Sequence, residues 1–414
     1  MLGRLRPALA GISGGLTFAI ACGIWLVTTL GALLLARREW IVAVTTLTVA
    51  APFVLVPAWR RRTSMFGLLV LSLAAFLLAS ESFIRLRYFG VDALKNPGRY
   101  QPIGAMEDPT YLERASEPDV PYTLNPGFDG WVKGARVTIN SLGLRDSEWV
   151  PGRRTDKRRI LTLGTSVTFG EGVPIEQTFS RQMARMLEIE GIPVEPLNFG
   201  VEGFVLGASQ ALLEVRGLAF YPDVVVQELS VAALRQSESR VEGLRRSFER
   251  TRAEPPRVSL FERHSFALYA IYPAISLRER LLRVTAADQP PDVRMAERPA
   301  YLDRALDRFA ALAARFGFTG VLLVPRPMLS LGRTDLHATD RRRLQRMAHD
   351  RGLLYVDSYD RFNASDVVER LIIFPGDLHP NAEGHRRHAA ALAAALAPVL
   401  RALHSAHGLA AVTR

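Results

Sequence analysis

Three long apolar runs occupy the N-terminal fifth of the chain, before any alternating pattern begins. Residues 8–36 contain no charged side chain, and neither do residues 40–59 or 63–80. An α-helix rises 1.5 Å per residue, so about 20 apolar residues cross a hydrocarbon core of about 30 Å. The pattern therefore predicts a membrane segment, residues 1–87, with about three transmembrane helices.

The first apolar run has a second interpretation as a cleavable signal peptide. Its apolar stretch is longer than such peptides use, and another apolar run follows directly. Basic residues favour the cytoplasmic side of short membrane loops. The sharpest basic cluster, three arginines at residues 60–62, lies on the side of the N-terminus if there are three spans. We therefore expect a multi-pass protein of the inner or cytoplasmic membrane, with the residues after 84 in the periplasm or outside the cell. An even number of spans would reverse this.

Residues 88–150 have a different pattern, in which short alternating stretches lie between turn signals. Asn-Pro-Gly occurs at residues 96–98 and again at 125–127, and the stretches 131–133 and 135–139 alternate apolar with polar side chains. Turn residues that flank such stretches are typical of short strands. We expect a small β-rich connector here and no independent domain.

From residue 158 the pattern changes to short β-branched runs separated by amphipathic stretches of helix length. This alternation is typical of a parallel sheet with crossover helices. It predicts an α/β domain over residues 151–403, a flavodoxin-like three-layer α/β/α fold, followed by a tail at 404–414. The expected strands are 159–164, 194–199, 223–229, 319–324 and 353–356, and the expected helices are 178–191, 209–219, 301–316, 340–351 and 382–403.

The third and fourth expected strands are about 90 residues apart, far more than one crossover needs. A helical insertion at about 235–300 accounts for the excess. It contains an Arg/Glu-rich stretch at 237–252 and an aromatic one at 261–282. These helices either cap the sheet or form a lid or acceptor-binding surface.

The net charge of +11 raises the question of an anionic partner. Residues 1–87 carry nine Arg and two Glu, so only +4 remains on the rest of the chain. The domain after the membrane segment is therefore no basic nucleic-acid module. The single cysteine, Cys22, excludes an intramolecular disulfide framework and any multi-cysteine zinc or iron-sulfur site.

A serine follows the first strand of the predicted sheet. The run 160–170 reads as a buried strand that ends at Gly164, after which Thr165 and Ser166 begin a polar turn. In parallel α/β sheets, sites form at the carboxyl ends of strands, where helix N-termini present free N–H groups. Ser166 either caps the next helix or is a nucleophile, which needs a base and an orienting carboxylate.

Such partners lie two residues apart before the last predicted helix, at Asp377 and His379. In extended backbone these side chains point the same way, so the carboxylate can reach the imidazole Nδ1 while Nε2 faces outward. The alternative is an exposed turn in which Asn381 starts the helix. His385 and His388 on that helix suggest either a metal ligand pair or a helix face wet by solvent, and we favour the solvent-exposed face.

These residues resemble the SGNH (GDSL-type) hydrolases. Their first block, Gly-Asp-Ser after strand one, is matched by residues 164–166, and their last block, Asp-x-His before a terminal helix, by 377–379. The glycine of their second block is matched by Gly200. The stretch 140–146 (Asn-Ser-Leu-Gly-Leu-Arg-Asp) is similar to the lead-in of membrane-linked members.

The resemblance implies roles for the matching residues. Ser166 would be the nucleophile, His379 the base and Asp377 its orienting carboxylate. The backbone N–H groups of Ser166 and Gly200 would hold the oxyanion. The family acts on acyl esters, commonly of carbohydrates or lipids, with no metal and no organic cofactor.

Two positions depart from the family pattern. Thr165 replaces the Asp of the first block, a mild change because that Asp is not the nucleophile. In the third block Ala232 takes the place of an Asn whose side chain donates to the oxyanion. Loss of one such donor typically costs about 10² to 10³ in rate.

The sequence therefore predicts a membrane-anchored, extracytoplasmic serine esterase or acyltransferase. Its partners would be the lipid bilayer, an acylated, chiefly acetylated, envelope glycan or lipid as substrate, and proteins of envelope polysaccharide assembly, with no nucleic acid. The alternative, favoured by Ala232, is a catalytically retired scaffold or binding protein in that assembly.

Overall fold

The computed structural model divides the described chain into two compact units. One contains residues up to Gly98 together with Ser265–Ala267, and the other contains the rest. The first two predicted transmembrane spans, apart from residues 57–59, lie outside the described residues, as do Cys22 and Ala232. The described residues are 57–102, 110–152, 157–231, 234, 239–253, 265–267, 291–328, 331, 337–363, 365–375 and 377–412.

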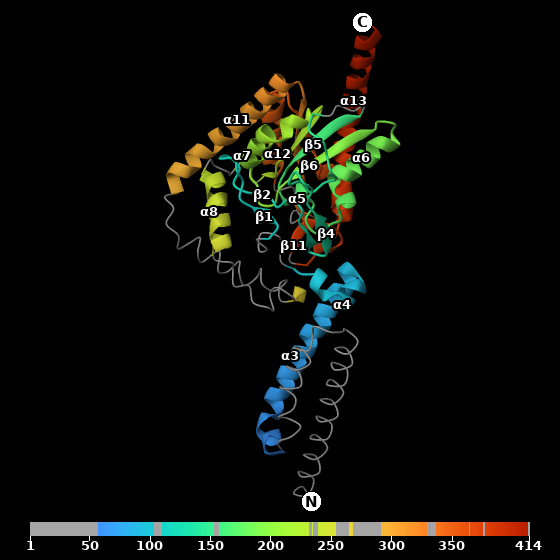
Figure 1. Cartoon of the computed structure of the whole chain (residues 1–414). Helices are drawn as coiled ribbons and strands as arrows, with labels where there is room; N and C mark the ends of the chain where they lie inside the picture. The colour runs from blue at the N-terminus through green and yellow to red at the C-terminus, as the bar shows by residue number, and fades with distance from the viewer. Residues whose placement is uncertain are drawn as a thin grey trace, which may run out of the picture. The chain divides into compact units, whose positions relative to one another are not determined.

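The first unit contains a long helix, α3 (Pro57–Phe89), and a short one, α4 (Asp92–Lys95). The buried Arg85 donates to Glu81 Oε1 (2.7 Å) and to the carbonyl of Ala93 (3.2 Å), so it ties the two helices together. The third predicted apolar run lies within α3, coloured blue in Figure 1. Over the described residues, none of the helices combines the length and apolarity that a membrane crossing requires.

Four short strands precede the main sheet. β1 (Leu112–Glu113) pairs with β2 (Thr123–Leu124), and β3 (Asp129–Val132) pairs with β4 (Ala135–Thr138), both antiparallel. The β3–β4 turn places Lys133 and Gly134 at φ 47° and 85°, the conformation of a tight hairpin. Buried side chains of this region join the largest core cluster, so the connector packs into the α/β domain.

Five parallel strands form the central sheet in the order β6-β5-β7-β8-β9. This is the flavodoxin-like order 2-1-3-4-5, so the predicted α/β class and five-stranded sheet are confirmed. Each observed strand lies within two residues of the predicted one at either end. The strands are β5 (Arg158–Gly164), β6 (Val194–Gly200), β7 (Val224–Glu228), β8 (Thr319–Val324) and β9 (Leu354–Asp357).

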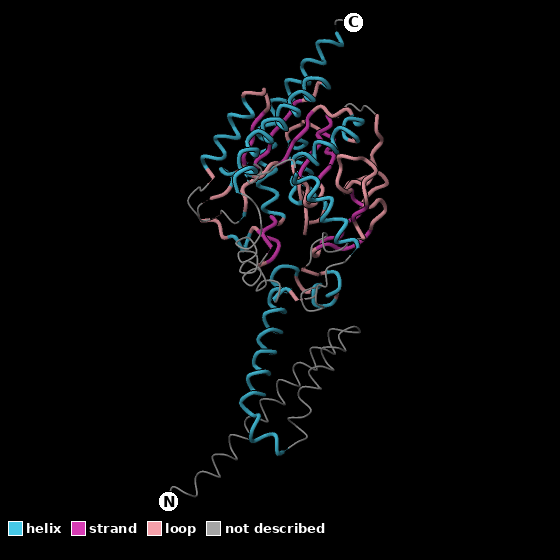
Figure 2. Tube along the Cα trace, turned by 90° about the vertical axis from the view of Figure 1, so that its left-hand side faces the viewer, coloured by secondary structure: helices cyan, strands magenta, loops and turns pink. Residues whose placement is uncertain are grey.

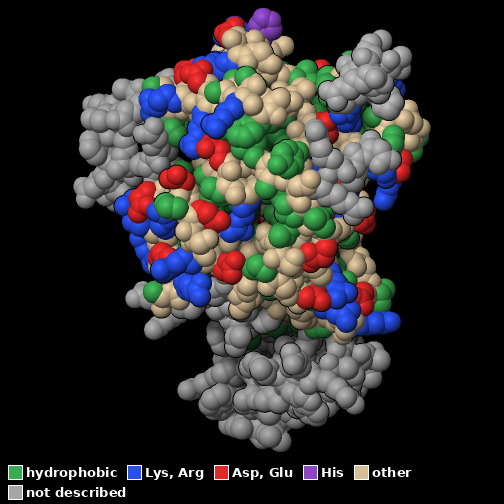
Figure 3. Space-filling view, turned by 45° about the horizontal axis from the view of Figure 1, so that its top comes forward, with side chains coloured by type: hydrophobic (Ala, Val, Ile, Leu, Met, Phe, Trp, Pro, Cys, Tyr) green, Lys and Arg blue, Asp and Glu red, His purple; other side chains and the backbone are tan. Residues whose placement is uncertain are grey.

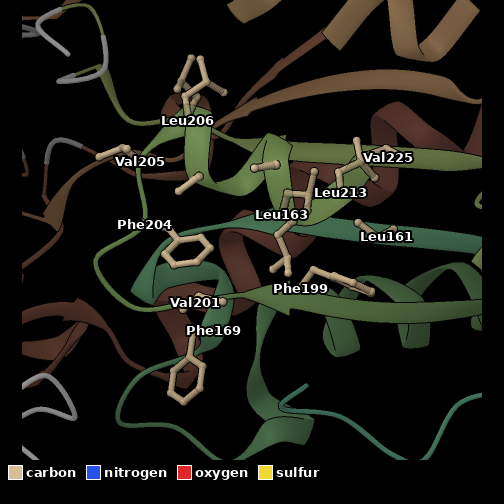
Figure 4. Packing of buried hydrophobic residues seen from close by; sticks show 14 of the residues in the cluster. Leu161, Leu163, Phe169, Phe199, Val201, Phe204, Val205, Leu206, Leu213 and Val225 are labelled. Carbon is tan, nitrogen blue, oxygen red and sulfur yellow. The ribbon is translucent and has the colours of Figure 1, made fainter. Parts of the chain in front are cut away.

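Helices cover both faces of this sheet (Figures 1 and 2). α6 (Phe179–Ile189) and α13 (Ala382–Val412) pack on one face, through a core that includes Ile160 and Val224 of the strands. α7 (Leu206–Val215), α11 (Pro291–Phe316) and α12 (Ala338–His349) contribute to the core on the other face. Figure 4 shows part of that second core, where Leu161 and Leu163 meet Leu213. Neighbouring strand residues point to opposite faces, which explains why continuous apolar runs marked these strands.

The remaining elements are short. They include α5 (Ser166–Phe169), the hairpin of β10 (Ile372–Phe374) and β11 (Asp377–Pro380), and 3₁₀ turns at Pro97–Arg99, Ile175–Gln177, Gly217–Phe220, Tyr359–Arg361 and Val368–Arg370. Acidic and basic side chains are interspersed on the face drawn in Figure 3. This mixed surface agrees with the small net charge expected beyond the membrane segment.

The region between β7 and β8 holds α8 (Ser239–Ala253), which matches the Arg/Glu-rich part of the predicted insertion. Its Phe248 is buried against Tyr122 of the connector, with ring centroids 5.3 Å apart. α8 therefore covers the connector. The aromatic stretch 261–282 lies outside the described residues except for Ser265–Ala267.

The expectation of a solvent-wet face for His385 and His388 is wrong, because both side chains are fully buried on α13. His385 Nδ1 accepts from the Phe179 N–H (3.2 Å), and His388 Nδ1 lies 2.8 Å from Ser358 Oγ. Burial lowers the pKa of both imidazoles, to about 3 for His388. Nor do they form a metal site: within the described ranges there is no group of three or more His, Cys, Asp or Glu side chains suited to a metal ion.

Candidate active site

Ser166 begins α5 directly after β5, at the carboxyl edge of the sheet. Thr165 is extended and caps the helix, its Oγ1 accepting from the Val167 N–H. Gly164 precedes it at a position with no room for a side chain, because a Cβ there would lie 2.4 Å from Glu228 Oε2. The strand-to-helix turn is therefore tight, and it brings the Ser166 hydroxyl out at the strand end.

Glu228, the last residue of β7, stabilises this turn through hydrogen bonds. Its Oε2 accepts from the Thr165 N–H (2.8 Å), from Thr165 Oγ1 (3.0 Å) and from Thr168 Oγ1 (3.2 Å). Burial raises the pKa of the Glu228 carboxyl. Thr165 thus caps α5 and binds a carboxyl group of the neighbouring strand.

The structure brings Ser166, His379 and Asp377 into one hydrogen-bonded chain. His379 Nε2 lies 2.7 Å from Ser166 Oγ, and Nδ1 lies 2.6 Å from Asp377 Oδ1. Asp377 Oδ1 also accepts the backbone N–H of His379 (2.9 Å). Because Asp377 and His379 belong to β11, their side chains point the same way, as alternation in extended backbone predicts.

Two further charged residues lie beside this hydrogen-bonded chain. Neither of them was identified from the sequence as a candidate site residue. Lys133, from the β3–β4 turn, forms ion pairs with Asp377 Oδ2 and with Glu171 Oε1, the latter at 2.6 Å. Glu171 Oε2 in turn lies 3.2 Å from His379 Nε2. The available signals were a Lys-Gly pair at the end of the first alternating stretch and a Glu-Gly pair that begins five residues after the candidate nucleophile.

These charges set the protonation of the imidazole. Burial lowers the pKa of His379, but the carboxylates of Glu171 and Asp377 outweigh it and raise the pKa to about 9. Burial raises the pKa of Asp377, but Lys133 and His379 more than compensate, and the pKa falls well below its usual range. The resting site therefore favours an imidazolium paired with carboxylates.

A fourth carboxyl group lies in the loop after β6. Tyr111 donates its hydroxyl hydrogen to Glu202 Oε2 (2.6 Å), and Tyr122 donates to the Glu202 carbonyl (2.8 Å). Burial and the charge of Glu171 raise the pKa of Glu202 to about 8. The connector tyrosines therefore hold the loop that carries Glu202.

Residues 140–146 stabilise the turn that carries Ser166, called the nucleophile turn below. The buried Arg145 donates to the carbonyls of Phe169 (3.0 Å) and Val173 (2.6 Å), on either side of the turn after α5. Asp146 accepts the N–H of Asn198 (2.8 Å) in β6. The stretch thus links the connector to β6 and to the segment that carries Ser166.

The oxyanion role of Gly200 that the resemblance implies stays a prediction. Its N–H donates to Asn198 Oδ1 (2.9 Å) and is therefore engaged. The glycine is required for a steric reason, because a Cβ there would lie 2.2 Å from the backbone nitrogen of Phe169. Ser166 is the first residue of α5, so its N–H has no acceptor within the helix. Ala232 lies outside the described residues.

Comparison with known proteins returned only distant structural similarities. No family model and no curated protein matches the chain. It is similar to LAE5, an α/β hydrolase enzyme from the metagenome of Lake Arreo, Spain, with 16% identity over 60% of this chain and 96% of that one (TM-score 0.36). It is also similar to a variant of Axe2, an acetyl-xylooligosaccharide esterase from Geobacillus stearothermophilus (16% identity, 58% and 94% covered, TM-score 0.37). A third similarity is to a putative lipolytic protein of the G-D-S-L family from Desulfitobacterium hafniense (13% identity, 58% and 100% covered, TM-score 0.33).

Proposed function

We propose that the chain is a serine ester hydrolase or acyltransferase that works through Ser166, His379 and Asp377. The observation that supports this best is the unbroken chain from Ser166 Oγ to His379 Nε2 (2.7 Å) and from Nδ1 to Asp377 Oδ1 (2.6 Å). A nucleophile, a base and an orienting carboxylate in this order are the requirements of acyl transfer through a covalent serine ester.

In the first half-reaction, Ser166 Oγ attacks the acyl carbonyl while His379 Nε2 accepts the hydroxyl proton. The carbonyl electron pair moves onto oxygen, and the Ser166 N–H at the start of α5 is the donor available to that oxyanion. When the intermediate collapses, the imidazolium gives its proton to the leaving alkoxide. The alcohol departs and the acyl group stays on Ser166.

In the second half-reaction, neutral His379 removes a proton from water or from an acceptor hydroxyl group, and the resulting nucleophile attacks the acyl-serine. Collapse of the second intermediate breaks the bond to Ser166 Oγ, which recovers its proton from the imidazolium. Water yields a free acid and an acceptor hydroxyl yields a new ester, so one site serves hydrolysis and transfer.

We propose acyl esters, chiefly acetyl esters, of an envelope glycan or lipid as substrates, and a multi-pass membrane anchor with the α/β domain outside the cytoplasm. The apolar runs before residue 87 and the resemblance of residues 164–166 and 377–379 support this choice. The second candidate function is that of a catalytically inactive scaffold or binding protein in envelope polysaccharide assembly. Ala232 and the engaged N–H of Gly200 favour it, because both reduce the donors available to an oxyanion.

Reaction of the full chain with a fluorophosphonate separates the two functions. We expect Ser166 to be labelled covalently, faster as the pH rises toward 9, because neutral His379 must accept its proton. Ser166→Ala should abolish the label, whereas Ser230→Ala, a partly buried serine just after β7, should keep it. Equal labelling of the parent and Ser166→Ala, or no labelling of either, would favour the scaffold.

A reporter that is active only outside the cytoplasm tests the topology. Fused after Arg414, it is expected to be active, as three spans with the arginines of residues 60–62 in the cytoplasm require. A cytoplasmic reporter at the same position serves as the control and should be silent. Activity of the cytoplasmic reporter instead would indicate an even number of spans or the opposite orientation.

A further inference from the structure

His379 Nε2 faces two partners. Ser166 Oγ lies 2.7 Å from it and Glu171 Oε2 lies 3.2 Å from it. The ring's other nitrogen, Nδ1, is bound to Asp377. The imidazole is therefore held between two carboxylates, one at each nitrogen, and the second lies beside the atom that must exchange a proton with the nucleophile.

Glu171 is fully buried and lies next to two cationic groups. Its side chain is 0% exposed. A carboxylate with no access to water requires a neighbouring cation, and the groups that meet its two oxygens are Lys133 Nζ and His379 Nε2. These two residues, together with the buried Arg145 guanidinium, which also interacts electrostatically with Glu171, stabilise the buried charge.

The backbone that carries Glu171 is part of the nucleophile turn. Its N–H donates to the Ser166 carbonyl (3.1 Å), and the glycines on either side adopt φ of 84° and 76°. A non-glycine residue is strained at such angles. One short turn therefore carries both the carboxylate of Glu171 and the hydroxyl of Ser166.

Lys133 reaches the same group from the connector. Its side chain is 5% exposed, and Nζ contacts both Glu171 and Asp377, so one ammonium group lies between the two carboxylates that flank His379. Lys133 itself has φ 47°, an unusual value for a residue with a side chain. The tight β3–β4 turn is what places the lysine here.

We propose that Glu171 is a second positioning carboxylate, which holds the Nε2–H of protonated His379 between turnovers, and that Lys133 positions Glu171 and Asp377 around the ring. This inference rests on the proposed function. Before each attack the Nε2 proton leaves to solvent, neutral His379 turns to Ser166 Oγ, and Glu171 then stabilises the imidazolium that forms as Ser166 loses its proton.

The charges around the ring determine the direction of the pH effect. Asp377 on β11 and Glu171 after α5 favour protonated His379, whereas Lys133 in the β3–β4 turn opposes it; Glu202 after β6 and Glu228 on β7 also interact with the ring electrostatically. Since neutral His379 is the active base, kcat/KM should rise about tenfold per pH unit below the His379 pKa. Removal of the Glu171 charge should shift this rise toward neutral pH, and removal of Lys133 should shift it toward alkaline pH.

The test measures the His379 pKa directly, by NMR of the full chain with ¹³Cε1-labelled histidine, and compares it with the pH profile of aryl-ester hydrolysis. In Glu171→Gln we expect the pKa of His379 to fall by about one pKa unit or more, as loss of a nearby opposite charge does. Lys133→Met should raise it, and Glu171→Asp should stay near the parent. His379→Gln identifies the resonance, and Glu176→Gln, an exposed glutamate nearby, is the matched control.

Opposite movements of the His379 pKa in Glu171→Gln and Lys133→Met would support the proposal, since a structural defect would move both variants the same way. An unchanged His379 pKa in a Glu171→Gln chain that melts near the parental temperature would overturn it. If Glu171→Gln does not fold, the comparison of Lys133→Met and Glu171→Asp with the parent decides instead. Absence of hydrolysis by the parent would count against the proposed hydrolase activity, whereas an unchanged His379 pKa would count against the role of Glu171; the NMR titration separates the two because it needs no turnover.

Discussion

Replacement of Asp377 by asparagine is expected to lower kcat for a short-chain aryl ester about 10⁴-fold while the chain still folds. Asp377 Oδ1 accepts from Nδ1 of His379 and from its backbone N–H, and an ionised carboxylate can only accept. An asparagine amide would donate toward Nδ1 and stabilise the tautomer that carries its hydrogen on Nε2. That tautomer cannot accept the proton of Ser166.

Steady-state kinetics of the full chain, together with its melting temperature, checks this result. Asp360→Asn, an exposed aspartate in the 3₁₀ turn after β9, is the control and should keep the parental kcat. Near-parental turnover of Asp377→Asn would show that Glu171 and Lys133 orient His379 without Asp377.

Replacement of Gly200 by alanine is expected to destabilise the α/β domain by about 3 kcal/mol or more. A Cβ at this position would lie 2.2 Å from the nitrogen of Phe169 and 2.5 Å from the carbonyl carbon of Thr168. Both are backbone atoms of α5 and cannot rotate away, so β6 or the nucleophile helix must shift. We expect the melting temperature to fall by about 6 °C or more for a domain of this size, and labelling of Ser166 to fall with it.

Gly243→Ala is the matched control, because Gly243 lies in α8 and a Cβ there meets no atom within 4 Å. Alanine favours a helix interior over glycine by about 0.5–1 kcal/mol, so this variant should melt at or above the parental temperature. A Gly200→Ala chain that melts like the parent would contradict the steric argument, because it would show that the backbone of α5 accommodates the added Cβ.

The nucleophile turn shows how structural and chemical roles overlap at the sheet edge. Thr165, Thr168 and Glu228 form one hydrogen-bonded group beneath Ser166. Arg145 holds the chain on the far side of α5. These four residues therefore fix the position of the Ser166 hydroxyl, although none of them belongs to the hydrogen-bonded chain of Ser166, His379 and Asp377.

Local pattern by itself determined the α/β class, the five strands and the pairing of Asp377 with His379. Each depends on neighbours along the chain: a run of β-branched residues makes a buried strand, and residues two apart in extended backbone share a direction. Ser166 could also be singled out, because a strand end followed by a polar turn is a local feature.

Only the tertiary structure decided which distant residues surround His379. Lys133 and Asp377 are 244 residues apart in the sequence, and no periodicity or spacing relates them. The burial of His385 and His388, and the steric requirement for glycine at position 200, likewise depend on what packs against them. Ion pairs and steric clashes depend on residues that are close in space but distant in sequence. They form only when the connector, the turn after β5 and the β10–β11 hairpin have folded onto one another.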